Sequence, residues 1–119
     1  MRIVVSKRTS FDAAHWLPNY IGKCNNIHGH HWIVEVAVSG EVDDQSGMVI
    51  DFTELKDFLE SVKSEFDHYL INKVIENPTA ENIIRHIYNK YEAWVWSRGI
   101  ELENITVWET EDSYAEYRK

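Results

Sequence analysis

The 119-residue sequence predicts an α+β fold, in which four antiparallel strands form a sheet with two helices on one face. Three observations predict it. Apolar and polar residues alternate near the N-terminus, apolar residues recur at helical spacing in two central segments, and alternation returns near the C-terminus. The predicted order is therefore strand, strand, helix, helix, strand, strand (ββααββ). No repeat or Pro/Gly-rich linker divides the chain, so we expect residues 1–119 to form a single domain.

The first two predicted strands cover residues 3–15 and 27–40. The first is rich in β-branched and small residues, and its apolar side chains largely share one parity. The second alternates strictly, with one side formed by Trp32, Val34, Val36 and Val38. Residues 16–26 contain proline, glycine and several asparagines, which is typical of a loop.

Start signals place the two helices. Asp51 begins a D-x-x-E capping box, and apolar residues at helical spacing continue to Phe66, so we expect a helix over residues 52–66. Thr79 is the expected N-cap of a second helix, whose apolar face runs to Val95 and which Gly99 should end. Alternation over residues 104–109 and a short segment at 113–117 predict the last two strands.

Composition narrows the class of protein. Twenty acidic residues against 12 Lys and Arg give a net charge of -8, which argues against binding to nucleic acids or anionic membranes. No apolar run is long enough to span a membrane, and the first residues lack the apolar core of a signal peptide. One cysteine excludes an intrachain disulfide and a multi-cysteine zinc site. We therefore expect a cytoplasmic protein with a small-molecule partner.

A histidine cluster is the most informative feature of the sequence. His28 and His30 lie two residues apart on a predicted strand, so both face the same side, whereas His31 faces the other side and should not be a ligand. His15 ends the preceding predicted strand, and hairpin pairing could bring it beside them. Three neutral imidazoles with one open position are typical of a catalytic zinc site, in which the metal is a Lewis acid.

Cys24 lies four residues before this pair and has three interpretations. It could be a small buried hydrophobe, although its polar neighbours favour exposure. It could be a thiolate, stabilised by Lys23 and a nearby metal ion, that acts as nucleophile or general base. It could also be a fourth zinc ligand that closes a structural site, and the spacing alone leaves these alternatives open.

Two further polar features are candidates for chemistry. Asp67 precedes His68 after the first helix, and such a pair can orient an imidazole for proton transfer, although Asp-His pairs also occur in ordinary loops. Glu109 shares the parity of Ile105 and Val107, so it should face the apolar side unless the strand simply ends at solvent. A carboxylate there could accept two hydrogen bonds from an amino-heterocycle.

Together these segments resemble the 6-pyruvoyltetrahydropterin synthase / 6-carboxytetrahydropterin synthase family over essentially the whole chain. The matching motifs are Phe11-Asp-Ala-Ala-His15, Cys24-x-x-x-His28-Gly-His30, Gly40-Glu-Val-Asp43, Gly47-Met-Val-Ile-Asp51-Phe, Asp67-His68, Asn77-Pro-Thr-Ala-Glu-Asn82, Trp108-Glu-Thr110 and Tyr114-Ala-Glu-Tyr117. The gap of three residues between cysteine and histidine resembles the carboxytetrahydropterin branch, which serves queuosine and related 7-deazapurine synthesis.

The resemblance implies a tunnelling fold (T-fold), whose subunits assemble into a barrel, commonly a hexamer made of two trimers. It implies Zn²⁺ held by three histidines, which correspond to His15, His28 and His30. The substrate would be 7,8-dihydroneopterin triphosphate, and the products 6-carboxy-5,6,7,8-tetrahydropterin, acetaldehyde and triphosphate. Two alternatives are 6-pyruvoyltetrahydropterin synthase activity, which eliminates only triphosphate, and a non-catalytic protein that binds pterin or zinc.

The resemblance also assigns roles to individual residues. Cys24 would be the proton acceptor, Asp67 and His68 would complete the relay across a subunit interface, and Glu109 would anchor the pterin ring and is sometimes grouped with the relay. The segment that corresponds to the lining of the pterin pocket is Thr79, Ala80 and Glu81. Because the chain is acidic, a triphosphate needs local cations, and Lys23 is the best candidate, with Lys7 and Arg8 as others.

Overall fold

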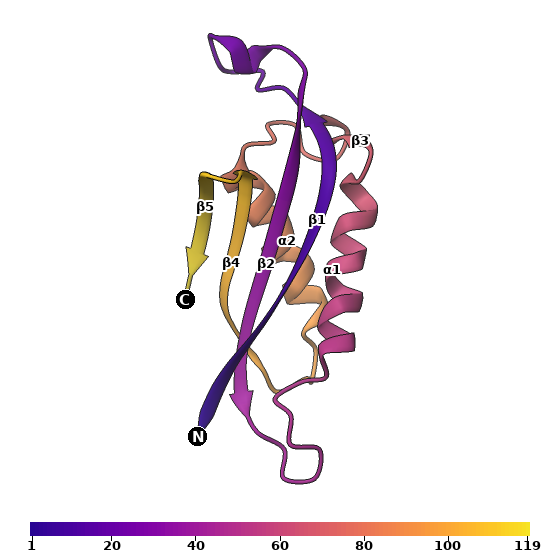
Figure 1. Ribbon diagram of the computed structural model, residues 1–119, viewed down its shortest axis with the longest axis vertical. Helices are drawn as coiled ribbons and strands as arrows, with labels where there is room; N and C mark the ends of the chain where they lie inside the picture. Colours follow the sequence, from indigo (N-terminus) through magenta and orange to yellow (C-terminus); the bar gives the residue numbers. More distant parts are fainter.

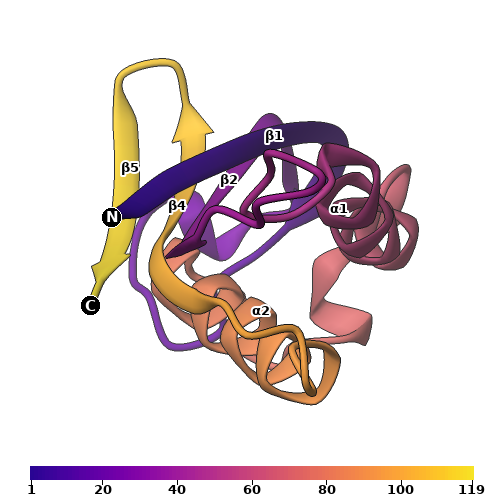
Figure 2. The same ribbon diagram turned by 90° about the horizontal axis from the view of Figure 1, so that it is seen from below.

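The computed structural model describes all residues, 1–119, as one five-stranded sheet with two α-helices. Its elements are β1 (Arg2–His15), β2 (His28–Glu41), α1 (Phe52–Phe66), β3 (Tyr69–Leu70), α2 (Ala80–Trp94), β4 (Glu101–Thr110) and β5 (Ser113–Arg118). The strand order is β3-β1-β2-β4-β5, and the four long strands pair antiparallel. Both helices lie on the same face of the sheet (Figures 1 and 2).

The long hairpin of β1 and β2 forms the centre of the sheet. Its register runs without interruption from Arg2 opposite Glu41 to His15 opposite His28. The predicted inward-facing row of β2, which begins at Trp32, has no exposed surface at all. The loop between the strands, residues 16–27, projects beyond the end of the sheet and contains a short 3-10 helix, Lys23–Asn25 (Figure 1).

The first helix has the bounds that the sequence predicts, and the second is shorter. The Asp51 side chain caps α1 by accepting a hydrogen bond of 2.8 Å from the amide of Thr53. In α2, Thr79 is the N-cap as expected, but the helix ends at Trp94 rather than near Gly99. Ser97 takes a positive φ of 55°, which ends the helical path before the glycine is reached.

The structure contains the four predicted antiparallel strands and adds a short strand at one edge. Tyr69–Leu70 pairs in parallel with Ala13 and Ala14 of β1 and adds a fifth strand. Two residues are too few to show alternation, so the sequence pattern holds no sign of this strand. Its consequence is to fix the segment after α1 beside the end of β1.

The molecule is elongated, with extents of 53 × 24 × 23 Å. Its radius of gyration is 15.5 Å, against about 13.5 Å for a compact domain of this length. The core is a single cluster of 20 buried residues between the sheet and the helices, while the opposite face of the sheet is uncovered. None of the helices is both long and apolar enough to cross a membrane.

Candidate metal centre and active site

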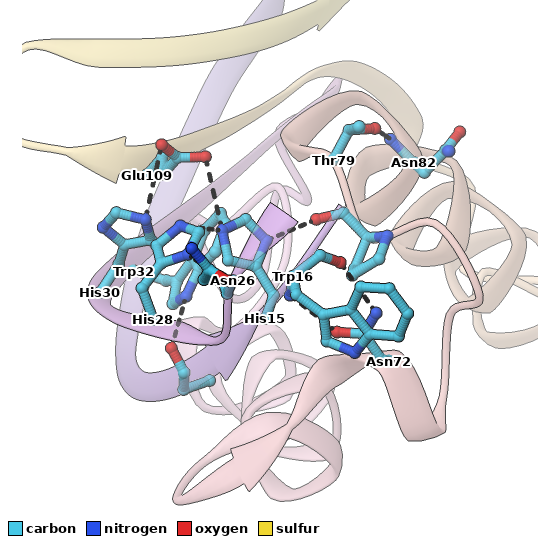
Figure 3. Close-up of polar contacts among 12 residues, drawn as sticks. His15, Trp16, Asn26, His28, His30, Trp32, Asn72, Thr79, Asn82 and Glu109 are labelled. Atoms are coloured by element: carbon cyan, nitrogen blue, oxygen red, sulfur yellow. Dashed lines mark hydrogen bonds and ion pairs between the residues drawn. The ribbon is translucent and has the colours of Figure 1, made fainter. Parts of the chain in front are cut away.

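Three imidazoles converge at the end of the hairpin (Figure 3). The pairing of β1 with β2 places His15 directly opposite His28, and His30 lies two residues further along the same face of β2. One ligand nitrogen from each ring can be chosen so that all three lie within 4.8 Å of one another. His15 is almost completely buried, and the other two are partly buried. The hairpin alone therefore gathers the three predicted ligands.

Hydrogen bonds fix the tautomer that two of these rings adopt when they are neutral. Nδ1 of His15 lies 2.8 Å from the carbonyl oxygen of Pro78, and Nδ1 of His28 lies 2.7 Å from that of Asn26. A carbonyl oxygen only accepts, so both Nδ1 atoms donate, and the neutral rings carry their lone pairs on Nε2. The two Nε2 atoms face each other at 3.1 Å. Two lone pairs at that distance repel unless a cation lies between them.

The donor set fits one zinc ion. Nitrogen ligands of a tetrahedral zinc ion lie about 3.3 Å apart, which is close to the observed separation of the Nε2 atoms of His15 and His28. Nε2 of His30 is buried without a hydrogen-bond partner, as expected of a ligand atom. His31 points to the other face, where its Nδ1 lies 2.8 Å from Asp12, as the strand pattern predicts.

Burial favours the neutral form of His15 and His30. The pKa of His15 lies below its ordinary value, chiefly because of desolvation and further because of His28, against the opposing effects of the Pro78 carbonyl and Glu109. Burial likewise lowers the pKa of His30, and Glu109 offsets part of the change. Neutral imidazole is the form that binds a metal ion.

Glu109 stands at the edge of the histidine cluster. Its carboxylate oxygens lie 3.5 Å from Nε2 of His30 and 3.9 Å from Nε2 of His15, and its side chain is 32% exposed. The sequence predicts that Glu109 faces the apolar side, and the structure confirms this orientation (Figure 3). It remains accessible enough to accept donors from a ligand.

Cys24 and Lys23 lie in the projecting loop, within its 3-10 helix. Cys24 is partly buried and its carbonyl accepts a hydrogen bond of 2.8 Å from the amide of Leu17, whereas its thiol is not part of the mutually close group of ligand atoms. Lys23 is exposed and forms no ion pair. The chain therefore does not bring Cys24 together with all three histidines.

Asp67 and His68 lie at the β3 edge of β1. Asp67 Oδ1 accepts a hydrogen bond of 3.1 Å from the amide of Asp12 and lies 3.1 Å from Nδ1 of His68. The Asp12 amide is the largest cause that lowers the pKa of Asp67, and the neighbouring His68 lowers it further. The His68 side chain is 79% exposed. The pair is preformed, but it is not part of the histidine cluster.

The remaining predicted residues begin α2. The Thr79 hydroxyl oxygen accepts a hydrogen bond of 3.1 Å from the amide of Asn82, which caps the helix, and Ala80 is its first residue. Glu81 is exposed. Because the Pro78 carbonyl accepts a hydrogen bond from His15, this segment starts directly beside the histidine cluster (Figure 3).

A family of known proteins matches this combination of fold and site. The model of the family described as 6-pyruvoyl tetrahydropterin synthase matches residues 4–119. The chain belongs to this family. The resemblance predicted from the sequence is thereby confirmed, as is the expectation that the chain is a lyase of the family.

Individual relatives support the same assignment. A 6-carboxy-5,6,7,8-tetrahydropterin synthase of Synechocystis is 38% identical and covers 96% of this chain and 92% of its own. A dihydroneopterin monophosphate aldolase of Pyrococcus furiosus is 36% identical, with 92% and 91% covered. The solved 6-pyruvoyl tetrahydropterin synthase of Caenorhabditis elegans has a TM-score of 0.88 at 29% identity, with 100% and 96% covered. The predicted T-fold of the subunit is confirmed.

Two side chains that support the site were not predicted to do so. The Trp32 ring packs edge-on against His15 and His30, with ring centres 4.9 and 5.5 Å apart. Asn72 binds both backbone groups of Trp16: its Oδ1 accepts from the amide at 3.0 Å, and its Nδ2 donates to the carbonyl at 2.8 Å. Asn72 thereby fixes the chain directly after His15. The local sequence gives no sign of this contact, since Asn72 and Lys73 between Ile71 and Val74 are typical of an ordinary polar turn.

Proposed function

We propose that the chain is a zinc-dependent lyase that acts on 7,8-dihydroneopterin triphosphate. With one water molecule, the reaction would give 6-carboxy-5,6,7,8-tetrahydropterin, acetaldehyde and triphosphate, as a step in queuosine or related 7-deazapurine synthesis. The observation that carries this proposal is the trio of His15, His28 and His30, whose free nitrogens converge beside Glu109. The name of the Synechocystis relative supports the choice of product.

The three histidines would hold the zinc ion, which as a Lewis acid would make nearby C–H and O–H bonds of the substrate more acidic. Glu109 would accept two N–H donors of the aminopyrimidinone edge and so orient the pterin ring. Thr79, Ala80 and Glu81 would line the pocket for that ring.

Cys24 would accept a proton, and His68, oriented by Asp67, would carry protons onward. Because one chain does not gather these residues around the histidines, we propose that neighbouring subunits complete the site in a homo-oligomeric barrel, a hexamer made of two trimers. Open strand edges favour such an assembly. A cytoplasmic location is part of the proposal and rests on the single cysteine.

Product analysis tests the proposed reaction. The zinc-loaded protein is incubated with 7,8-dihydroneopterin triphosphate, and acetaldehyde, triphosphate and the pterin product are each measured. We expect acetaldehyde and triphosphate in equal amounts, and none of either from the His28→Ala variant. Release of triphosphate without acetaldehyde would contradict the proposal and indicate a pyruvoyltetrahydropterin synthase.

The Pyrococcus furiosus relative, named as an aldolase, favours a second candidate reaction. Retro-aldol cleavage of dihydroneopterin monophosphate breaks the bond between the first two side-chain carbons and gives 6-hydroxymethyl-7,8-dihydropterin and glycolaldehyde phosphate. The ring keeps its oxidation state in this reaction, whereas the proposed lyase forms a tetrahydropterin. Parallel assays with the monophosphate and triphosphate substrates, with both aldehydes measured, distinguish the two reactions.

A further inference from the structure

Half of the basic side chains are free of ion pairs, and Lys73 is the one of these that lines the same hollow as His68. Six of the 12 Lys and Arg residues form ion pairs with carboxylates, namely Arg2, Arg8, Lys90, Arg98, Arg118 and Lys119. Lys73 forms none, and it lies in the turn between β3 and α2, five residues after His68. Its ammonium nitrogen is 5.3 Å from the centre of the Tyr69 ring, which holds the charge at the surface of β3.

Lys73 forms part of the wall of two hollows. One, of about 440 Å³, is also lined by Asp12, His68 and Tyr69. The other, of about 470 Å³, is also lined by Trp16, Asn72 and Glu76. Both hollows therefore border the end of β1 that carries His15.

Each of the two carboxylates near the first hollow has one oxygen engaged. Asp12 Oδ1 lies 2.8 Å from Nδ1 of His31, and Asp67 accepts the Asp12 amide and orients Nδ1 of His68. His68 is held with φ of 58° and with its amide donating to the Asp12 carbonyl at 2.7 Å. Among the polar groups that remain free at this hollow are the Lys73 ammonium and Nε2 of His68, a combination that suits a phosphate group. Asp12, whose second oxygen is not engaged, also borders the hollow.

We propose that Lys73 and His68 form an anion subsite that binds the phosphate chain of the substrate. The chain has a net charge of -8, so attraction of an anion must come from a local cation that no carboxylate neutralises. The identity of the anion as part of a dihydroneopterin phosphate rests on the proposed function, whereas the existence of the subsite does not.

Binding of inorganic phosphate to the zinc-loaded protein tests the subsite. The ³¹P resonance of phosphate is followed during titration of the wild type, Lys73→Ala and Lys73→Arg. The matched control is Lys56→Ala, because Lys56 is an exposed lysine of α1 that forms no ion pair. We expect Lys73→Ala to weaken phosphate binding about tenfold, the size of one charge-assisted hydrogen bond, and Lys73→Arg and Lys56→Ala to retain it. If zinc-free His28→Ala still binds phosphate, the anion is held by the subsite and not by the metal ion.

Steady-state kinetics gives the second readout. For 7,8-dihydroneopterin triphosphate, we expect Lys73→Ala to raise KM about tenfold with kcat within about twofold of the wild type, because the contact binds substrate and transition state equally. Wild-type phosphate affinity in Lys73→Ala, or a fall in kcat at unchanged KM, would overturn the inference. If the wild type fails to turn over this substrate, the proposed function is wrong, and the phosphate titration still decides on the subsite.

Discussion

The histidine cluster and the Asp67–His68 turn differ in how completely one chain builds them. His15 is 1% exposed and its ring is held by a backbone carbonyl and by Trp32, whereas the His68 side chain is 79% exposed. The three histidines proposed as metal ligands are fixed by strand pairing within a hairpin, while the groups proposed for proton transfer lie at the periphery. Metal binding and turnover should therefore respond separately to mutation.

The largest expected effect follows from His28→Ala. This change removes one of only three imidazoles, so we expect the zinc content to fall to background and the turnover with it. The control is His31→Ala, whose ring faces the opposite side of β2 and should leave zinc unchanged. Metal analysis after dialysis measures both. Stoichiometric zinc in His28→Ala would show that the histidine cluster does not hold the metal, and would contradict the separation of metal binding from turnover.

Cys24→Ala should strongly lower turnover without loss of metal. The thiol lies outside the mutually close group of ligand atoms, so we expect stoichiometric zinc, and loss of a general base should lower kcat by about 10²–10⁴-fold. Zinc content and acetaldehyde release are measured on the same sample. If zinc is lost together with activity, Cys24 is a fourth ligand, and the proposed catalytic role is incorrect.

Asn72→Ala should weaken the metal centre without removal of a ligand. Its side chain holds both backbone groups of Trp16, so its loss lets the chain after His15 shift. We expect zinc affinity to fall about 10–100-fold, as for other groups that orient metal ligands. Competition with a chelator measures the affinity, and Asn89→Ala, an exposed change on α2, is the control. An unchanged affinity would show that strand pairing alone positions His15.

The smallest effect concerns pH and the Asp67 carboxylate. The hydrogen bond from the Asp12 amide is the largest cause that lowers the pKa of this carboxylate. The carboxylate therefore stabilises the fold above its ordinary pKa of 3.8, and this stabilisation is lost as pH falls through the lowered pKa. Asp67→Asn should therefore show a shallower loss of stability with acid than the wild type. Thermal unfolding followed from pH 6 to pH 3 checks this, and parallel profiles for the two proteins would contradict it.

The sequence predicted those parts of the fold in which a long pattern repeats. Fourteen-residue strands and an apolar stripe over α1 contain several periods each, so β1, β2 and α1 were located almost to the residue. The two-residue β3 and the end of α2 depend on single backbone angles and on tertiary pairing, which leave no periodic trace.

The candidate site divides in the same way. Two-residue spacing on a strand predicted that His28 and His30 share a face, and antiparallel pairing predicted the place of His15. The sequence could not predict that Asn72 would bind the backbone of Trp16, because the two residues are 56 positions apart and their contact depends on how the turn after β3 folds back. The roles of Cys24, Glu109 and the start of α2 stay predictions.

The elongated shape has a consequence for folding equilibrium. The chain exposes 7311 Å², against about 6,700 Å² for a compact protein of 14.0 kDa, and only 26 of its 119 residues are buried. A monomer of this kind obtains little free energy from its own core. If copies associate along the open edges of the sheet, dilution dissociates them and lowers the stability of each chain. The melting temperature should then rise with protein concentration.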